Sequence, residues 1–383
     1  MNATHITSLS YWEQSTFIQA DIIVIGAGIV GLSAALNLIR LNPNKKILVL
    51  ERGVLPTGAS TKNAGFSCFG SLSEIAADLD ILSEEDVLSL ISMRWNGLQL
   101  LRKTLGDEAM GYEEHGSFEV FTPTQESLYK RSIQLLDQYN QHLKQIIGVD
   151  QVFQPADQYI ETFGFKGVKH LIRNTAEGQI DTGSTMNALL QLVRNAGVQV
   201  LTGVEITSYQ TANNQVEVQT PELGKLSCHQ LLFCTNGFAA QLLPDIDVQP
   251  GRAQVLITSE IPNLKLKGCF HMEEGYYYFR NVGNRVLFGG GRNLDKAGET
   301  TYSHEITPLI QNQLNTYLKE VILPDVEYSV EMRWAGTLGL GKTRLPIVQK
   351  IEPGVYCAVR MGGMGVAIGS LIGKQAAELL MNQ

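Results

Sequence analysis

Three glycines near the start of the chain have the spacing of a dinucleotide-binding turn. Gly26, Gly28 and Gly31 form the pattern G-x-G-x-x-G between a short apolar run, Ile22 to Ile25, and residues that are apolar at helical spacing. In such a turn the first glycine makes a tight bend, the second lets the backbone approach a pyrophosphate, and the third allows close helix packing. The amide groups at the start of the helix attract the anion. The segment therefore predicts a strand, a turn and a helix that bind a dinucleotide.

An acidic residue follows where such a site needs one. The run KILVLER predicts a second parallel strand, and Glu51 near its end follows Gly31 by twenty residues. A carboxylate there would accept hydrogen bonds from ribose hydroxyls. The first apolar run is too short to cross a bilayer, so no transmembrane segment is expected there. We predict that cofactor contacts come from Gly26, Ala27, Gly28, Ile29, Val30, Gly31, Glu51 and Arg52.

The next segment bears on whether the dinucleotide is NAD or FAD. It reads GASTKNAGFSCFGS, from Gly58 to Ser71, and by composition alone it also fits a flexible surface loop. Together with the preceding E-R-G, this loop resembles the flavin-dependent amine and amino-acid oxidoreductases, the superfamily of D-amino-acid oxidase, glycine oxidase and sarcosine oxidase. The resemblance implies that the loop runs along FAD, with contacts from Ser60, Thr61, Asn63, Ala64, Gly65 and Phe66.

Two internal segments resemble the same superfamily in the same order. Asp181 to Gln210 looks like the element that brings a backbone group to the adenine, here around Val204. Leu231 to Phe238 is similar to the family's A-T-G turn, which implies that Thr235 and Gly237 lie beside the cofactor.

The C-terminal segment GVYCAVRMGGMGVAIGSLIGKQAAELL resembles the family's closing strand, glycine turn and helix. The resemblance implies that amides of Gly363, Met364 and Gly365 face the flavin pyrimidine ring. The positive end of the helix dipole would favour negative charge on the reduced ring. An ordinary strand-to-helix turn is the other interpretation of these glycines.

These motifs predict an α/β fold with two domains. The Rossmann-like FAD-binding domain is assembled from residues 1–75, 166–243 and 335–383, and the substrate domain from residues 76–165 and 244–334. The second domain is predicted to be α+β. Residues 84–106 and 125–148 have apolar residues at three- and four-residue steps, which predicts cap helices. Alternating runs between Pro250 and Gly291 predict a mixed, largely antiparallel sheet. In the superfamily the substrate lies between this sheet and the flavin.

Strand alternation supplies the first candidates for substrate contacts. It assigns Tyr276, Tyr278 and Arg280 to one face of a strand and Tyr277 and Phe279 to the other. We predict that the face with Tyr276 and Tyr278 borders the flavin cavity and positions the substrate. Filling of a sheet core is the alternative for each tyrosine.

Arg333 is the second candidate, because it lies next to Trp334 in an apolar, glycine-rich stretch. A buried guanidinium needs a partner, and a substrate carboxylate would match its planar fork. In glycine oxidase and D-amino-acid oxidase an arginine on the corresponding strand binds that carboxylate, so the resemblance implies this role for Arg333. An ion pair with a protein carboxylate such as Glu331 is the alternative.

The resemblance implies an FAD-dependent oxidoreductase that oxidises the C–N bond of a small amine or amino acid. Hydride passes to flavin N5, and the resulting imine hydrolyses. A dry apolar cavity lowers the pKa of an amine, so no dedicated base is required. Sarcosine oxidases attach flavin through a cysteine, but the matching stretch of this chain has none, which predicts non-covalent FAD. They also carry a lysine beside the flavin that NRVLFGGGR lacks, so the electron acceptor is either oxygen or a quinone or other carrier.

Three other functions compete with this one, of which the NAD-dependent one is disfavoured. The nearest is an FAD-dependent dehydrogenase of a 2-hydroxy acid or polyol on the same fold, because Arg333 would bind either carboxylate. An NAD-dependent dehydrogenase would leave the loop from Gly58 to Ser71 without a role. A regulatory protein that binds FAD without turnover is the non-enzymatic interpretation.

Composition narrows the partners and the compartment. The net charge of −8 and the lack of basic clusters argue against a nucleic-acid partner. The five cysteines and seven histidines show no ligand spacing, which predicts reduced thiols and no metal site. Cys68 is expected to be a buried small residue. The first twenty residues have no basic or apolar region of a secretory signal, so a cytoplasmic protein is expected.

Overall fold

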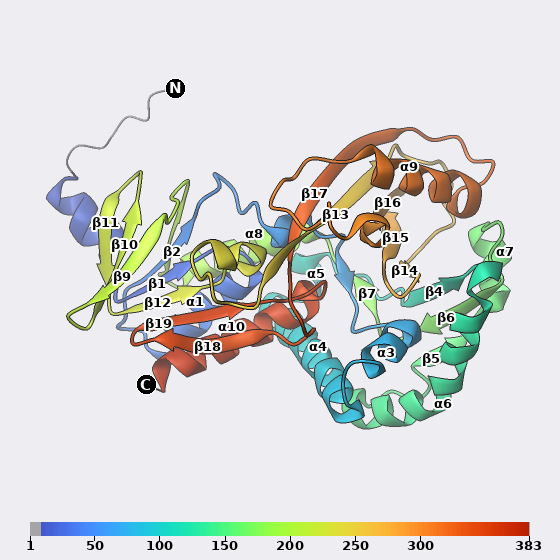
Figure 1. Ribbon diagram of the computed structural model, residues 1–383, viewed down its shortest axis with the longest axis horizontal. Helices are drawn as coiled ribbons and strands as arrows, with labels where there is room; N and C mark the ends of the chain where they lie inside the picture. Colours follow the sequence, from blue (N-terminus) through green and yellow to red (C-terminus); the bar gives the residue numbers. More distant parts are fainter. Residues whose placement is uncertain (1–8, 383) are drawn as a thin grey trace.

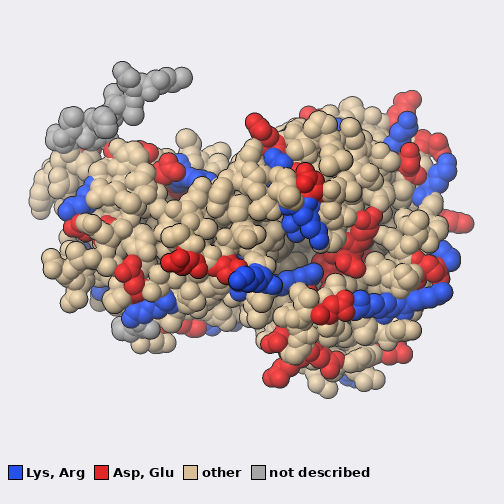
Figure 2. All heavy atoms as spheres, viewed as in Figure 1, with Lys and Arg blue, Asp and Glu red and all other residues tan. Residues whose placement is uncertain are grey.

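The computed structural model describes residues 9–382 and places two different sheets at opposite ends of the molecule (Figure 1). Residues 1–8, which carry part of the expectation about a secretory signal, lie outside the described residues. No helix within residues 9–382 is long and apolar enough to cross a membrane. Acidic and basic side chains are intermixed on the face that Figure 2 shows, which is hollowed near its centre.

The first sheet has the strand order β18-β19-β12-β1-β2-β8, in which all neighbours are parallel except β18 and β19. Its strands come from distant parts of the chain, so the predicted Rossmann-like assembly from separated segments is confirmed. The bounds are β1 (Ile22–Ile25), β2 (Ile47–Glu51), β8 (Gln199–Thr202), β12 (Gln230–Phe233), β18 (Ile347–Glu352) and β19 (Val355–Val359).

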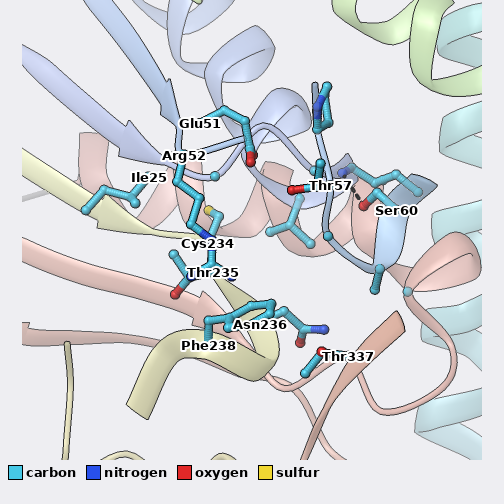
Figure 3. A pocket seen from close by; sticks show the side chains of 18 of the residues that line it. Ile25, Glu51, Arg52, Thr57, Ser60, Cys234, Thr235, Asn236, Phe238 and Thr337 are labelled. Atoms are coloured by element: carbon cyan, nitrogen blue, oxygen red, sulfur yellow. Dashed lines mark hydrogen bonds between the residues drawn. The ribbon is translucent and has the colours of Figure 1, made fainter. Parts of the chain in front are cut away.

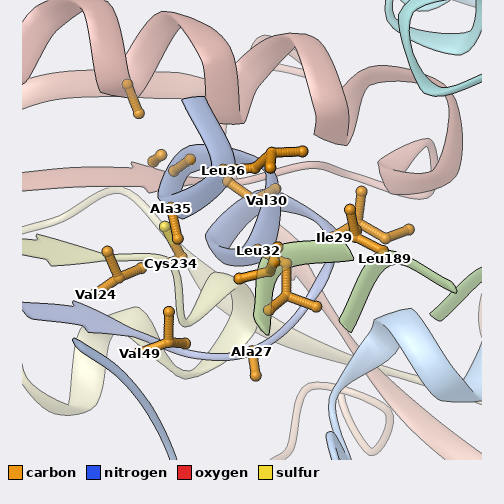
Figure 4. Close-up of a cluster of buried hydrophobic side chains, with 14 of the residues drawn as sticks. Val24, Ala27, Ile29, Val30, Leu32, Ala35, Leu36, Val49, Leu189 and Cys234 are labelled. Atoms are coloured by element: carbon orange, nitrogen blue, oxygen red, sulfur yellow. The ribbon is translucent and has the colours of Figure 1, made fainter. Parts of the chain in front are cut away.

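Different layers cover the two faces of this sheet. Side chains of α1, α8 and α10 pack with Val24 and Val49 on one face, in the buried cluster of Figure 4. On the other face Ile23 and Leu48 pack against a three-stranded antiparallel sheet. The covering elements are α1 (Ile29–Leu41), α8 (Thr182–Asn195), α10 (Gly365–Met381), β9 (Ser208–Ala212), β10 (Gln215–Thr220) and β11 (Gly224–Cys228).

The second sheet has the order β17-β13-β16-β15-β14-β4-β6-β5. Its neighbours are antiparallel except β14 and β4, which confirms a mixed, largely antiparallel sheet. One face packs on α9 around Phe270, Phe279 and Phe288, and the other faces the loop before β3. The bounds are β4 (Ser117–Phe121), β5 (Phe153–Pro155), β6 (His170–Asn174), β13 (Gln249–Thr258), β14 (Cys269–Met272), β15 (Tyr277–Val282), β16 (Arg285–Gly290), β17 (Val330–Leu340) and α9 (Pro308–Tyr317).

The two segments predicted as cap helices form α4 and α6, but α4 also joins the two halves. Gly97 of α4 lies directly against the carbonyl of Ala367 in α10, and Ser370 donates a hydrogen bond of 2.5 Å to the Gly97 carbonyl. The remaining α-helices and strands within residues 9–382 are α2 (Ala59–Lys62), β3 (Phe66–Ser67), α3 (Leu72–Leu79), α4 (Glu84–Leu105), α5 (Asp107–Met110), α6 (Glu126–Ile147), α7 (Ile160–Phe163) and β7 (Gly178–Gln179).

The sheets do not follow the predicted segment boundaries at residues 166 and 335. Strand β6 and the whole of β17 pair within the second sheet, because β17 continues without a break from Val330 to Leu340 beside β13. The second sheet thus includes residues that the prediction assigned to the FAD-binding domain. The C-terminal end of β17 therefore reaches the first half of the molecule.

The packing of α10 on α1 depends on small residues and gives a test of the fold. A β-carbon on Gly373 would lie 2.6 Å from the carbonyl oxygen of Val30. We expect Gly373→Ala to lower the free energy of unfolding by about 1–3 kcal/mol, the usual cost of overpacking. Lys374→Ala, at a partly exposed position of the same helix where only a surface ion pair with Glu378 is lost, should change it by less than about 1 kcal/mol. Urea unfolding of both variants measures the difference, and equal stability would contradict this packing.

Candidate functional site

A cavity of about 430 Å³ lies at the carboxyl ends of β1, β2 and β12 (Figure 3). This is the edge of a doubly wound sheet where ligands bind. Most of the predicted cofactor residues line it, as do several that sequence reasoning did not identify. The predicted residues that line it are Gly26, Gly28, Ile29, Val30, Glu51, Arg52, Ser60, Asn63, Val204, Thr235, Gly363 and Gly365.

The glycine turn has the close contacts that the sequence pattern requires. Gly26 has a φ of +102°, and a β-carbon on it would lie 2.9 Å from the carbonyl oxygen of Cys234. A β-carbon on Gly28 would lie 2.8 Å from Oγ of Ser60, which accepts a hydrogen bond of 2.9 Å from the Ile29 amide. Gly31 does not line the cavity, because it packs directly against the Gly26 carbonyl. The turn therefore opens the N-terminus of α1 to the cavity.

Glu51 is a buried carboxylate at the edge of this cavity. Its Oε2 accepts a hydrogen bond from the amide of Ala27, and its Oε1 accepts one from Gly53, both at 3.0 Å. The side chain is directed into the cavity in Figure 3. Ala27 itself is buried and does not line the cavity. Glu51 thus fixes the glycine turn and presents an acceptor to a ligand.

An aromatic residue that the sequence analysis missed lies opposite Arg52. The guanidinium carbon of Arg52 is 4.0 Å from the ring centre of Phe238, which also stacks on Tyr302. Arg52 lies 3.9 Å from the carboxylate of Glu205, another cavity residue. The sequence offered one indication that Phe238 reaches the cavity, which is its place directly after the turn Thr235-Asn236-Gly237 (the T-N-G turn).

The loop around α2 turns some predicted residues away from the cavity. Asn63 Oδ1 accepts hydrogen bonds from the amide of Gly65 at 2.8 Å and from the hydroxyl of Thr182 at 2.9 Å. Thr61 instead donates to the Pro56 carbonyl. Ala64 and Phe66 pack on the second sheet. The loop therefore lies between the cavity and that sheet.

The other wall of the cavity is formed by the T-N-G turn, the end of β17 and the start of α10. Thr337 and Leu338 of β17 line it, although the sequence analysis did not identify them. Gly237 is buried under the Leu338 carbonyl and does not line it. Met364 precedes α10 and, unlike its neighbours Gly363 and Gly365, does not line it either.

The face of the second sheet that meets the loop is apolar and aromatic. Val255 and Leu287 pack with Ala64, and the ring centres of Phe66 and Tyr278 lie 5.7 Å apart. Burial raises the pKa of Tyr278 to about 12, so its hydroxyl is protonated at neutral pH. Together, five residues of this contact form an aromatic wall: Phe66, Val255, Tyr278, Leu287 and Trp334.

Arg333 lies on the opposite face of the sheet from the aromatic wall. Its neighbour Trp334 is on the wall, whereas Arg333 donates hydrogen bonds to the side-chain oxygens of Gln311 and Asn315 on α9. The structure thus does not place Arg333 where a substrate carboxylate could meet it. The alternative partner, Glu331, pairs with Arg285 instead. Two amides, not a carboxylate, satisfy this guanidinium.

Tyr276 also lies away from Tyr278, because the strand begins one residue later than predicted. Glu273, Glu274 and Gly275 all have positive φ, and the Tyr276 amide closes this turn by donating to the Glu273 carbonyl. The Tyr276 ring packs with the core beneath α9. Of the two predicted tyrosines, only Tyr278 is on the aromatic wall.

Three buried donor groups behind Phe66 lie within 4.8 Å of one another: the thiol of Cys68, the carboxylate of Glu177 and the ring of His271. Burial raises the pKa of Cys68 well above its ordinary value, so the thiol is protonated, in accordance with a buried small residue. Glu177 already accepts hydrogen bonds from the amides of Phe69 and Gly70 and from Ser117. We assign no metal to this hydrogen-bonded cluster.

Comparison with known proteins places this site in a family context. The chain is 25% identical to a probable oxidoreductase OrdL of Rhizobium meliloti, over 95% of this chain and 84% of that protein. It is 23% identical to the gamma-glutamylputrescine oxidoreductase of Escherichia coli, with the same coverage. The glycine oxidase of Bacillus cereus has the same fold, with a TM-score of 0.77, 18% identity and 95% of each chain covered. The FAD-dependent oxidoreductase family DAO matches residues 21–379, and the chain therefore belongs to this family of FAD-dependent enzymes.

Proposed function

We propose that this FAD-dependent oxidoreductase oxidises the C–N bond of a small amine that carries no carboxylate on the reacting carbon. The observation that carries the proposal is the aromatic wall, an apolar surface next to the cofactor loop that itself contains no cationic side chain. The name of the relative from Escherichia coli, a gamma-glutamylputrescine oxidoreductase, also supports an amine substrate.

The cavity residues fit FAD as a non-covalent cofactor. The open N-terminus of α1 and the bare backbone at Gly28 suit a pyrophosphate, and the buried Glu51 carboxylate suits ribose hydroxyls. Gly363 and Gly365 at the start of α10 suit the flavin ring, where the helix dipole favours negative charge. Ala27, Gly31, Thr61, Ala64, Gly65, Gly237 and Met364 would then support the contact residues from behind.

The aromatic wall favours the reactive form of an amine. A bound FAD would supply the acceptor for a hydride equivalent from the carbon next to nitrogen, and the imine left behind would be hydrolysed by water. Only a neutral amine can donate its electrons in this way, and an apolar surface disfavours the ammonium form. Phe66, Leu287 and Trp334 provide such a surface, and the protonated hydroxyl of Tyr278 can orient the nitrogen.

The cations near the aromatic wall already have protein partners, which argues against a carboxylate on the substrate. The strands β13 to β17 and the cofactor loop contain five cationic residues. Arg252 pairs with Glu299 and Arg285 with Glu331, whereas Arg280 donates to backbone carbonyls and Arg333 to two side-chain amides. Lys62 is hydrogen-bonded to the ring of His304, which leaves its charge without an acidic partner. A 2-hydroxy acid would also need a cation to bind its carboxylate, so oxidation of that class of substrate is disfavoured.

A donor screen tests the proposal. Anaerobic mixing with primary and secondary amines should bleach the flavin absorbance, whereas the matching α-amino acids and 2-hydroxy acids should react at least tenfold more slowly. Readmitting air then shows whether oxygen accepts the electrons. Bleaching by hydroxy acids alone would refute amine oxidation.

The role of Glu51 can be measured through cofactor affinity. Glu51→Gln replaces one acceptor oxygen with an amide donor that cannot pair with the amide of Ala27 or Gly53. Because hydrogen bonds to charged groups contribute about 1.5–3 kcal/mol, we expect the dissociation constant of FAD to rise by about tenfold or more. Reconstitution of the apoprotein followed by fluorescence gives the dissociation constant. Glu205→Gln, an exposed change at the same cavity, is the control and should retain normal affinity.

Replacement of Arg333 distinguishes the two faces of the sheet. Arg333→Gln should leave the concentration of amine that gives half-maximal flavin reduction unchanged within about twofold, because the side chain faces α9. Loss of the hydrogen bonds from Arg333 to α9 should lower the free energy of unfolding by about 1 kcal/mol. A tenfold or greater rise in that concentration, with FAD still bound, would show that Arg333 contacts the substrate after all.

A further inference from the structure

Arg280 is a buried cation that bonds to the cofactor loop and has no acidic partner. It is 6% exposed, and it donates hydrogen bonds to three backbone carbonyls: Ala64 at 2.5 Å, Ile180 at 2.9 Å and Asn281 at 3.2 Å. Within residues 9–382 no carboxylate lies within ion-pair distance of it. The carboxylates of Glu113 and Asp181 act on it only through the electrostatic field, without a hydrogen bond.

The geometry fixes Arg280 against the segment that follows the cavity residue Asn63. Gly65 has a φ of +75°, and a β-carbon on it would lie 2.6 Å from a guanidinium nitrogen of Arg280. The Ile180 amide in turn donates to the Gly65 carbonyl at 2.9 Å. Arg280 therefore joins the cofactor loop to the segment before α8, and only a glycine leaves room for it.

The same side chain lies on the face of the second sheet that borders the cofactor loop. In the β15–β16 pairing Arg280 is directly opposite Leu287, a residue of the aromatic wall that packs with Ala64. A guanidinium keeps its proton in a protein, even where burial lowers its pKa. Carbonyl dipoles satisfy its hydrogen bonds but leave its net positive charge in place, and a low-dielectric setting strengthens the field.

We infer that Arg280 is a positioning residue that holds the Ala64–Gly65 turn in place and raises the reduction potential of the bound flavin. Two-electron reduction adds negative charge to the flavin, so a buried positive charge held against the cofactor loop favours the reduced form. The inference rests on the FAD site of the proposed function but not on the identity of the substrate.

The reduction potential of the holoenzyme tests this inference. Stepwise reduction with a reference dye needs no amine, so its outcome is independent of the donor screen. In Arg280→Gln we expect the equilibrium ratio of reduced to oxidised flavin to fall at least tenfold. This corresponds to a drop of about 30 mV in the reduction potential of a two-electron couple. Arg280→Lys keeps the charge but not the three hydrogen bonds, so it should retain most of the potential and release FAD faster.

A matched control variant shows whether the effect is specific to Arg280, and a second variant replaces Arg280→Gln if that protein does not bind FAD. Arg285→Gln removes a cation from the adjoining strand, but one that is paired with Glu331, and should leave the potential unchanged. If Arg280→Gln does not retain FAD, Asn281→Asp serves instead, because it adds a buried negative charge on the residue whose carbonyl accepts a hydrogen bond from Arg280, across the strand from the guanidinium. The potential should then fall in the same direction. A wild-type potential in the FAD-loaded Arg280→Gln enzyme, or in Asn281→Asp where the first variant fails, would overturn the inference.

Discussion

The attachment of the loop from Ser60 to Phe66 to helix α1 and to the second sheet is the constraint on which the rest of the structure depends. On one side Ser60 accepts a hydrogen bond from the first turn of α1. On the other side Arg280 and Trp334 of the second sheet donate to the carbonyls of Ala64 and Lys62. A loop of small residues is needed because glycine, serine and alanine allow backbones from both halves to come close. The cavity and the aromatic wall are thereby held in a fixed relation.

The parts of the site that sequence predicted are those with local physical requirements. The glycine turn and Glu51 could be identified because each step, a bend, a close approach and an acceptor, needs a particular residue type at a particular distance along the chain. Phe238 and Thr337 could not be identified in this way. They reach the cavity through the turn after β12 and the far end of β17, which are brought together only by the tertiary fold.

The substrate side was harder to predict, because alternation separates two faces of a strand but does not say which face meets the cofactor. Arg333 and Trp334 are neighbours in sequence, and pairing with β13 puts Trp334 beside Val255 and Arg333 beside Leu256, on the side of α9. The amide partners of Arg333 lie in a helix that sequence reasoning had not connected with it. Tyr276 was misplaced for a different reason, since a turn with positive φ delays the start of β15.

The central claim is that the apolar wall selects an amine without a carboxylate on the reacting carbon. The most direct measurement compares two donors that differ only in that group, putrescine and ornithine, by the rate at which each reduces the bound flavin in anaerobic rapid mixing. The account predicts that the diamine reduces the flavin at least tenfold faster than the amino acid. Faster reduction by the amino acid would contradict it, because it would require a carboxylate-binding cation that this wall does not provide.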